Sequence, residues 1–311
     1  MDDGPVHRCR RRTLMSVSLK GRTAIVTGAA VGIGNAYAKA MAREGCNVAV
    51  IDLRPEIMDL TKDLEAHGVK AMAVVGDVSQ PATVRKFVDD VIARFGGVDI
   101  LINNAGQCSV SLVDDDLDKS LADYESMVGT NLRGEYLMGR AVIPQMLKQG
   151  RGGEIVNIGT DHGVTCGSPR EICPHLSTCT WGDAPRPTGG GTVMDIYDAS
   201  KYGTYALTFA WAKALRPHNI RVNCMCMGAT DSWMIRNFFG ERATPEEVAT
   251  WMTAEDSAQV VVDILREGPK GRTGETINLC VGRPCKKEPE REPIYVTPES
   301  IGYDQRETVD A

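Results

Sequence analysis

The stretch TGAAVGIG, from Thr27 to Gly34, is a glycine-rich turn between a strand-like and a helix-like segment. The residues that lead into it, TAIVT from Thr23, are apolar or β-branched, which is typical of a buried parallel strand. Beyond the turn, apolar residues recur at the spacing of one helix face, at Ile33, Ala36, Tyr37, Ala40 and Met41. This order places backbone N–H groups where they can hold a phosphate, although such a turn can also be purely structural.

The alternation of strand and helix continues along the chain. Further strands are predicted at Asn47–Asp52, Val69–Val75, Val98–Asn103, Glu154–Ile158, Arg221–Met225 and Thr276–Cys280. Helices are predicted near residues 84–95, 118–149, 195–216 and 254–266. We find no internal repeat and no linker between two cores. The sequence therefore predicts an α/β fold, a single domain with a doubly wound parallel sheet of about seven strands.

Composition excludes several classes of protein. The 311 residues are 42% hydrophobic and 24% charged, which is enough to build a large core. The 35 Lys and Arg against 41 Asp and Glu, a net charge of -6, argue against a nucleic-acid partner. No apolar run approaches the roughly eighteen residues of a membrane span, and no export signal is recognised. The ten cysteines show no pairing framework, so we expect a cytoplasmic protein that acts on a small molecule.

The second predicted strand ends on a carboxylate, Asp52, about twenty residues beyond the glycines. At that place in a doubly wound sheet, a carboxylate can accept hydrogen bonds from the ribose hydroxyls of an adenine dinucleotide and repel a 2′-phosphate. The chain is therefore predicted to bind NAD rather than NADP. Arg54, two residues later, softens this preference because a guanidinium attracts phosphate.

Several further motifs occur in the order in which one large enzyme family carries them. They are Asp77-Val78, NNAG at 103–106, Asn131, YDASK at 197–201 and NIRVNCMCMGATDS at 219–232. With the glycine-rich turn, they make the chain similar to the short-chain dehydrogenase/reductase family in its shorter single-domain form, from about Leu19 to Gly282. The resemblance implies a Rossmann-like fold, an NAD cofactor and oxidoreductase activity.

By this resemblance, the cofactor contacts are spread over the ends of several strands. Asp77 and Val78 would flank the adenine, Asn104 to Gly106 would line the cleft, and Gly228 to Ser232 would cradle the nicotinamide end. The expected contact residues are Gly28, Val31, Gly32, Ile33, Gly34, Asp52, Leu53, Asp77, Val78, Asn104, Ala105, Gly106, Tyr197, Lys201, Gly228, Thr230 and Ser232. Met227 departs from the family, which commonly has Pro there. Taken alone, NNAG could be a turn that ends a strand, and Asp77 a solvated carboxylate.

Tyr197 and Lys201 lie four residues apart on a predicted helix, so both side chains project from one face. A phenol with an ordinary pKa near 10 is a poor base at neutral pH, and an adjacent ammonium lowers its pKa. We therefore expect Tyr197 to act as general acid/base. The resemblance adds that Lys201 would bind the nicotinamide ribose. Without the other motifs, the two residues would be an exposed helix pair.

Thr160 stands where the family places a serine, in the stretch NIGTDHG from Asn157 to Gly163. Its hydroxyl can donate to a substrate oxygen, although it could instead hydrogen-bond only the backbone. Thr160, Asp161, His162 and Tyr197 are the predicted substrate contacts. Asn131 aligns with the asparagine that holds a water in the family's proton relay; its alternative role is to bend its helix. The predicted catalytic set is Asn131, Thr160, Tyr197 and Lys201.

The resemblance also sets the domain boundaries. Residues 19–282 would form the NAD-binding catalytic domain. Because an ordered pattern begins only at about Leu19, residues 1–18 are predicted to be a disordered extension, with Met15 as an alternative start. The charged residues 283–311 are predicted to be a C-terminal extension, either a flexible end or an arm docked on another subunit. Residues 164–195 are inserted between two catalytic positions and are interpreted as a substrate lid. A disordered surface excursion is one alternative. The other is a zinc site on Cys166, Cys173, His175 and Cys179, but their spacing lacks a CxxC pair and no metal is expected.

The predicted function is hydride transfer between a secondary alcohol or ketone and NAD, with Tyr197 moving the hydroxyl proton. Two other classes stay open. One is a catalytically idle NAD-binding sensor or scaffold, and the other is a lyase or epimerase that uses the cofactor transiently. The family resemblance also implies a homo-oligomer, a tetramer or dimer, built on the two long helices and the last strand.

Overall fold

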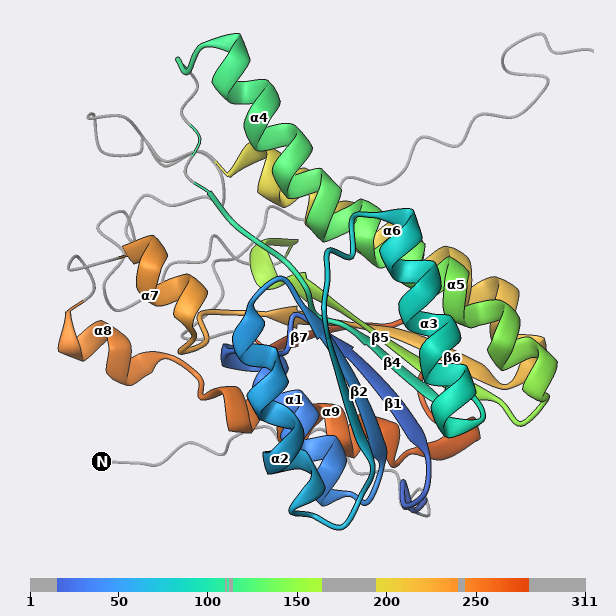
Figure 1. Cartoon of the computed structure of the whole chain (residues 1–311). Coiled ribbons are helices and arrows are strands. Elements are labelled where there is room, and N and C mark those ends of the chain that lie inside the picture. The colour runs from blue at the N-terminus through green and yellow to red at the C-terminus, as the bar shows by residue number, and fades with distance from the viewer. Residues whose placement is uncertain (1–15, 110, 112–113, 164–193, 240–243, 280–311) are drawn as a thin grey trace, which may run out of the picture.

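The structure, a computed structural model, describes residues 16–109, 111, 114–163, 194–239 and 244–279 (Figure 1). These residues form one parallel sheet with the strand order β3-β2-β1-β4-β5-β6-β7. The strands are β1 (Thr23–Thr27), β2 (Asn47–Asp52), β3 (Ala71–Val75), β4 (Ile100–Asn103), β5 (Gly153–Thr160), β6 (Ile220–Met227) and β7 (Thr276–Leu279). The predicted doubly wound, Rossmann-like α/β sheet is confirmed.

The order of the strands reverses at β1, which pairs with β2 on one side and with β4 on the other. Ala24 lies opposite Val48 of β2 and opposite Ile100 of β4. All residues of β1, β4, β5 and β6 are buried, as expected for central strands that helices cover on both faces. In such sheets, ligands bind in the crevice at the carboxyl ends of the strands where the order reverses.

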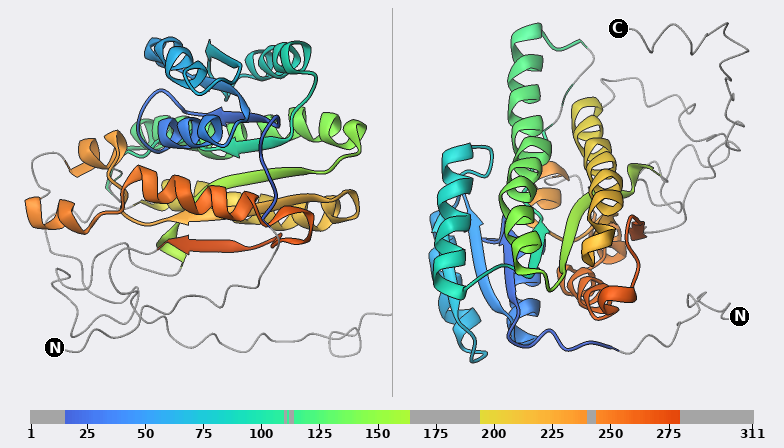
Figure 2. Two further views of the ribbon diagram at one scale, coloured as in Figure 1. Left: turned by 90° about the horizontal axis from the view of Figure 1, so that it is seen from below. Right: turned by 90° about the vertical axis from the view of Figure 1, so that its right-hand side faces the viewer.

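Helices cover both faces of the sheet (Figures 1 and 2). They are α1 (Gly32–Arg43), α2 (Leu60–Glu65), α3 (Pro81–Phe95), α4 (Leu117–Val128), α5 (Glu135–Gln149), α6 (Asp195–Leu215), α7 (Trp233–Phe239), α8 (Pro245–Thr250) and α9 (Ala254–Leu265). One core packs α1, α2 and α9 on the sheet, and the other packs α3, α5 and α6 on the opposite face. The short helices α2, α7 and α8 were not predicted, because six or seven residues do not establish a helical period.

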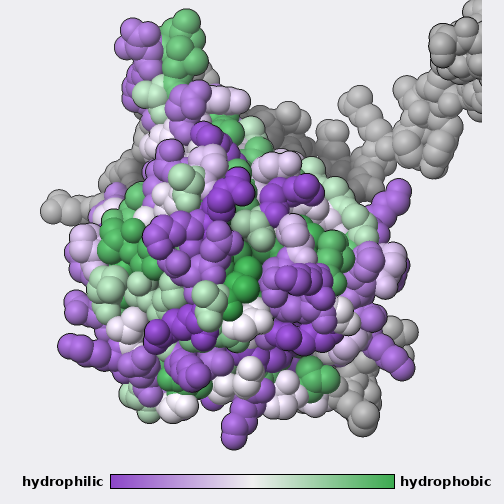
Figure 3. All heavy atoms as spheres, turned by 45° about the vertical axis from the view of Figure 1, so that its right-hand side comes forward, coloured by the Kyte–Doolittle hydropathy of each residue, from purple (hydrophilic) through white to green (hydrophobic). Residues whose placement is uncertain are grey.

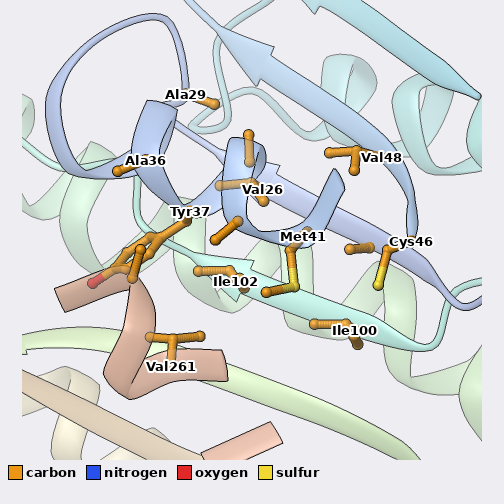
Figure 4. Packing of buried hydrophobic residues seen from close by; sticks show 14 of the residues in the cluster. Val26, Ala29, Ala36, Tyr37, Met41, Cys46, Val48, Ile100, Ile102 and Val261 are labelled. Carbon is orange, nitrogen blue, oxygen red and sulfur yellow. The ribbon is translucent and has the colours of Figure 1, made fainter. Parts of the chain in front are cut away.

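In each core, a large aromatic residue packs between helices. Tyr37 of α1 lies among Val26, Ile102 and Val261 (Figure 4), and its hydroxyl is 2.7 Å from Ser257 Oγ of α9. On the other face, Trp211 of α6 packs in the core with α3 and α5. These contacts join α1 to α9 on one face of the sheet and α6 to α5 on the other.

The helix predicted over residues 118–149 is interrupted. Between α4 and α5, residues Gly129–Gly134 form a π-helical turn, η2, which contains Asn131. A π turn adds one residue per turn, and such turns are frequent at functional sites. The alternative in which Asn131 accompanies a distortion of its helix therefore agrees with the structure, although hydrophobic periodicity did not reveal where the distortion lies.

Several predicted segments lie outside the described residues. They are the N-terminal extension apart from residues 16–18, the insertion apart from residues 194–195, and the C-terminal extension. Met15 and the four candidate zinc ligands also lie outside. In the described part of the chain, no helix is both long and apolar enough to cross a membrane.

Candidate active site

The glycine-rich turn has no space for side chains at its glycines. Because side chains are absent there, a ligand can approach the backbone N–H groups closely. Gly28 and Gly32 have φ of +64° and +62°, a conformation that favours glycine. A Cβ on Gly34 would lie 2.2 Å from the Gly28 carbonyl oxygen. Helix α1 begins at Gly32, with no acidic residue in its first turn and no described side chain capping it at Val31. Its N–H groups therefore fit a phosphate, as predicted.

Hydrogen bonds join the NNAG motif, at the end of β4, to this turn. Asn104 Nδ2 donates to the carbonyl oxygens of Thr27 (3.0 Å) and Gly28 (2.9 Å). The Thr27 hydroxyl accepts from the backbone N–H groups of Asn104 (3.0 Å) and Ala105 (2.9 Å). A Cβ on Gly28 would lie only 2.7 Å from Ala105 Cα. The motif thus has a structural role that also places Asn104 to Gly106 beside the predicted cofactor cleft.

Asp52 lies at the end of β2 and is hydrogen-bonded at both carboxylate oxygens. Oδ2 accepts from the Ala30 N–H and Oδ1 accepts from the Arg54 N–H, both at 2.9 Å. The Arg54 guanidinium stacks over Trp233, 3.9 Å from the centre of the ring. Trp233 is the first residue of α7, and its neighbour Ser232 lies close to Gly32. Trp233 was not predicted as a site residue, because nothing local in the sequence shows that α7 begins beside the end of β2.

The remaining predicted cofactor residues occupy different surroundings. Val78 is buried against Gly134, whereas Leu53 is exposed. Asp77 Oδ1 accepts from the Ser79 N–H at 2.8 Å. The Thr230 hydroxyl donates to the Gly228 carbonyl at 2.9 Å, which stabilises the turn after β6 even though Met227 replaces proline. Their contacts with a cofactor stay predictions.

The predicted catalytic residues meet where β5 ends and α6 begins. Thr160, the last residue of β5, is buried, and its side chain is hydrogen-bonded to Tyr197 of α6. Lys201 Nζ, one turn further along α6, donates to the Ile158 carbonyl at 2.7 Å. A Cβ placed on Gly106 would lie 3.4 Å from both Lys201 Nζ and Asn131 Oδ1. The four residues therefore surround one region next to the NNAG motif.

The electrostatics of Tyr197 differ from the expectation. Burial raises the pKa of Tyr197 far above its ordinary value, Cys108, Asp198 and Asp161 raise it further, and the hydrogen bond with Thr160 lowers it. In the structure, the effect of burial on the Tyr197 pKa outweighs the lowering expected from the Lys201 ammonium. Burial also lowers the pKa of Lys201 itself, so the ammonium is costly to maintain without an opposing charge.

Asn131 is held by three hydrogen bonds. Its amide nitrogen donates to the Gln107 carbonyl and to Ser200 Oγ, both at 3.0 Å. Its amide oxygen accepts from the Gln107 N–H at 2.8 Å. Ser200 precedes Lys201 on α6, so the π turn is joined directly to the helix that carries the catalytic pair. The relay role of Asn131 stays a prediction.

Asp161 and His162 lie beside Tyr197, as predicted for substrate contacts. Asp161 is buried, and the His162 ring lies edge-on to the Tyr197 ring with centroids 6.1 Å apart. His162 Nδ1 is 2.7 Å from a carboxylate oxygen of Asp198, the residue after Tyr197. This pair orients the imidazole at the edge of the site. Asp198 was not predicted as a site residue, although its position inside YDASK places it on the helix of the catalytic pair.

Other neighbours of the site were also missed. The Tyr205 hydroxyl donates to the Thr160 carbonyl, and Glu135 is buried on the sheet side of α5. Cys224 and Cys226 of β6 are buried in the core. Among the described residues, no group of three His, Cys, Asp or Glu side chains could hold a metal ion.

Comparison with known proteins agrees with this class of fold and site. A family model described as short chain dehydrogenase matches residues 22–170 and 188–243. The short-chain dehydrogenase/reductase eriH of Hericium erinaceus is 32% identical over 277 residues, which cover 86% of this chain and 99% of that protein. The chain therefore belongs to the short-chain dehydrogenase/reductase family of oxidoreductases, as the motifs predicted.

Solved structures support the same assignment. The crystal structure of a short-chain type dehydrogenase/reductase from Mycobacterium marinum has a TM-score of 0.70 and 26% identity, covering 86% of this chain and 96% of that one. A short chain dehydrogenase from Mycobacterium paratuberculosis, bound to NAD, has a TM-score of 0.68 and 25% identity, covering 86% and 98%.

Proposed function

We propose that the protein is an NAD-dependent oxidoreductase that interconverts a secondary alcohol and a ketone. The observation that carries this proposal is the meeting of Thr160, Tyr197 and Lys201 beside Gly106, at the carboxyl ends of the strands. A hydroxyl, a phenol and an ammonium in one partly enclosed region can bind a substrate oxygen and move its proton.

The residues around the glycine-rich turn fit a nicotinamide dinucleotide. Gly28 to Gly34 would hold the pyrophosphate at the N-terminus of α1, and Asp52 would accept from the adenosine ribose. The Asp52 carboxylate supports NAD over NADP, and the NAD-bound structure of the relative from Mycobacterium paratuberculosis agrees with this choice. When bound, the cofactor supplies the hydride acceptor or donor.

In the proposed mechanism, the Thr160 hydroxyl donates a hydrogen bond to the substrate oxygen and holds it next to Tyr197. In the direction of oxidation, Tyr197 takes the substrate hydroxyl proton at its phenolic oxygen, and it returns the proton in reduction. Because burial and nearby acids raise the pKa of Tyr197, its phenolate requires positive charge close by. Lys201, one turn further along α6, supplies this charge in the proposed mechanism.

The experiment that tests this function combines NAD with a panel of cyclic, aromatic and steroidal secondary alcohols. Absorbance of the reduced nicotinamide reports turnover, and Tyr197→Phe is the control. Turnover that the control loses supports the proposal. If Tyr197→Phe binds NAD normally and keeps nearly full turnover, the assignment of Tyr197 is wrong. If NAD binds tightly and no alcohol or ketone reacts, the idle sensor replaces the enzyme, and the departure to Thr160 is its motivating observation.

We also propose that the protein forms a homo-oligomer through the outer face of α4, α5 and α6. This face exposes large apolar side chains, namely Leu117, Leu121, Tyr124, Tyr136, Leu147, Tyr202 and Phe209. Figure 3 shows an apolar patch among hydrophilic residues on the projecting end of α4. Solvent-exposed patches of this kind mark interaction sites. Light scattering should give a dimer or tetramer, and a monomer for Leu121→Glu with Phe209→Glu; a monomeric wild type would refute the proposal.

A cytoplasmic location is proposed from the cysteines. The structure describes Cys46, Cys108, Cys224 and Cys226, and all four are free thiols. Free thiols persist in a reducing compartment. Fractionation of the native host that places the protein in an oxidising compartment would contradict this proposal.

A further inference from the structure

A second buried ionisable group, Glu135, is hydrogen-bonded to the helix that carries the catalytic lysine. Glu135 is the first residue of α5, directly after the π turn that contains Asn131. Only 5% of Glu135 is exposed. Its Oε2 accepts from the Thr204 hydroxyl at 2.9 Å, while Oε1 has no hydrogen-bond partner among the described residues. A buried carboxylate oxygen with no partner is costly unless the group is neutral or an opposite charge lies near.

The nearby cation is Lys201, one helical turn before Thr204 on α6. Lys201 is also 5% exposed, and its ammonium donates to the Ile158 carbonyl at 2.7 Å. A single neutral carbonyl does not offset the burial of a full positive charge. The ionisable groups that face Lys201 are Glu135 from α5, Cys108 from the segment after β4, and Cys224 and Cys226 from β6.

Each member of the pair changes the protonation of the other. Burial raises the pKa of Glu135 to about 8, and the Lys201 ammonium and the Thr204 hydroxyl hold it below what burial alone would give. Burial lowers the pKa of Lys201, and Glu135 is the first of the groups that oppose this. The charges of both Glu135 and Lys201 act on the pKa of Cys224, but the Cys224 thiol stays protonated because burial raises that pKa. Glu135 is therefore the carboxyl group that can balance Lys201, as a carboxylate, as the pH rises through its pKa of about 8.

We propose that Glu135 is the buried counter-ion of Lys201 and acts as a positioning residue that keeps the lysine charged for Tyr197. This inference rests on the proposed function, since Lys201 matters only if Tyr197 handles a proton. The pair exchanges one proton between Lys201 Nζ and a Glu135 carboxylate oxygen. The charged form is an ammonium with a carboxylate, the other form is an amine with a carboxylic acid, and no further reactant is needed.

The protonation of Glu135 can be measured without substrate or cofactor. A buried carboxyl that burial keeps neutral has an infrared carbonyl stretch, which a carboxylate lacks. Infrared difference spectra between the wild type and Glu135→Gln isolate this band. We expect it to disappear as the pH rises through about 8. In Lys201→Met the midpoint should rise by about one pH unit or more, because the cation that favours the carboxylate is gone.

Two comparisons separate coupling from a structural effect. Lys201→Arg keeps the positive charge and should leave the midpoint close to that of the wild type. Glu154 is a matched control, because it is a second buried carboxyl whose pKa burial raises, to about 7, and its main charged partner is Arg221 rather than Lys201. Its band, identified with Glu154→Gln, should titrate at the same pH in all Lys201 variants.

The outcomes decide the proposal by themselves. A Glu135 midpoint that does not move in Lys201→Met, or that moves equally in Lys201→Arg, overturns it. If Lys201→Met does not fold, Lys201→Gln replaces it: an upward shift of the Glu135 midpoint supports the proposal, and an unchanged midpoint overturns it. If no alcohol in the panel is turned over but Glu135 and Lys201 titrate as a coupled pair, the proposed enzyme function is wrong and the counter-ion role of Glu135 stands.

Once a substrate is known, the pH profile of kcat supplies a second readout. Loss of the Glu135 charge lowers the pKa of Lys201, so the Tyr197 phenolate loses support and its pKa rises further. In Glu135→Gln, the acid limb of the oxidation profile should therefore move to higher pH by about one unit. A uniform loss of kcat at every pH would instead show a structural role and overturn the proposal.

Discussion

Replacing Trp233 with alanine removes the aromatic face on which the Arg54 guanidinium stacks, 3.9 Å from the ring centre. The Arg54 backbone N–H is bound to Asp52, so this side chain starts at the place where the adenosine ribose would be held. Freed from Trp233, the guanidinium can turn toward a 2′-phosphate, which it attracts and Asp52 repels. Trp233→Ala should therefore weaken the preference for NAD over NADP.

The size of the effect follows from the contact that is lost. Trp233 is 52% exposed, and a cation–π contact at an exposed site contributes about 1 kcal/mol, which is roughly fivefold in a Kd. We expect the ratio of the Kd for NADPH to the Kd for NADH to fall by about this factor. Asp52 remains in place, so NADH should still bind more tightly.

Calorimetric titration of both reduced cofactors measures this ratio directly. Arg54→Ala combined with Trp233→Ala should restore the wild-type ratio, because the gain requires the guanidinium. Trp251→Phe is the matched control, since Trp251 carries a different arginine, Arg236, at 5.5 Å. If Trp233→Ala changes both Kd values by one common factor, the stack only retains the dinucleotide, and the argument from Arg54 fails.

Three further outcomes concern stability. Arg221→Met should lower the free energy of unfolding, measured by urea denaturation, by about 3–5 kcal/mol. The reason is that the buried Glu154 carboxylate, 2.9 Å from the Arg221 guanidinium, loses its cation. Adding Glu154→Met should recover most of the lost stability. Burial raises the pKa of Glu154 from 4.5 to about 7. The stability linked to protonation of Glu154 is therefore present below pH 4.5 and is lost as the pH rises through 7. Arg221→Met should make this loss steeper, and an unchanged pH dependence of stability would contradict this account. Gly139→Ala should lower the free energy of unfolding by about 1–3 kcal/mol, because a Cβ there would lie 2.2 Å from the rigid Trp211 ring; a neutral result would mean that α5 and α6 separate freely.

The fold and the family motifs were predictable because local pattern and order suffice for them. Residues 23–27 are a continuous apolar run that ends on a glycine, and Tyr197 and Lys201 share one helix face by spacing alone. The strand boundaries moved by a few residues: β5 continues to Thr160 and β6 to Met227. These extensions carry the candidate site, since they place Thr160 at the rim of the sheet.

The unpredicted parts of the site depend on contacts between distant segments. Glu135 looks like an ordinary charged residue at the start of a helix, and its burial follows only from the packing of α5 against α6. Trp233 and Arg54 are separated by most of the chain, so no local pattern joins them. The lowering of the Tyr197 pKa stays a prediction for the complex with the cofactor, while the strong effect of burial was not foreseen, because spacing shows which groups are near but not how deeply they are buried.

The position of β1 in the middle of the sheet also bears on the synthesis of the protein. During translation, β1 and β2 can pair as soon as both have left the ribosome, but the other edge of β1 waits for β4, in which Ile100 is the partner of Ala24. Until then the nascent chain carries an unpaired apolar strand edge, which is a site for aggregation. Newly made chains are therefore expected to need chaperone protection during the interval between these two strands.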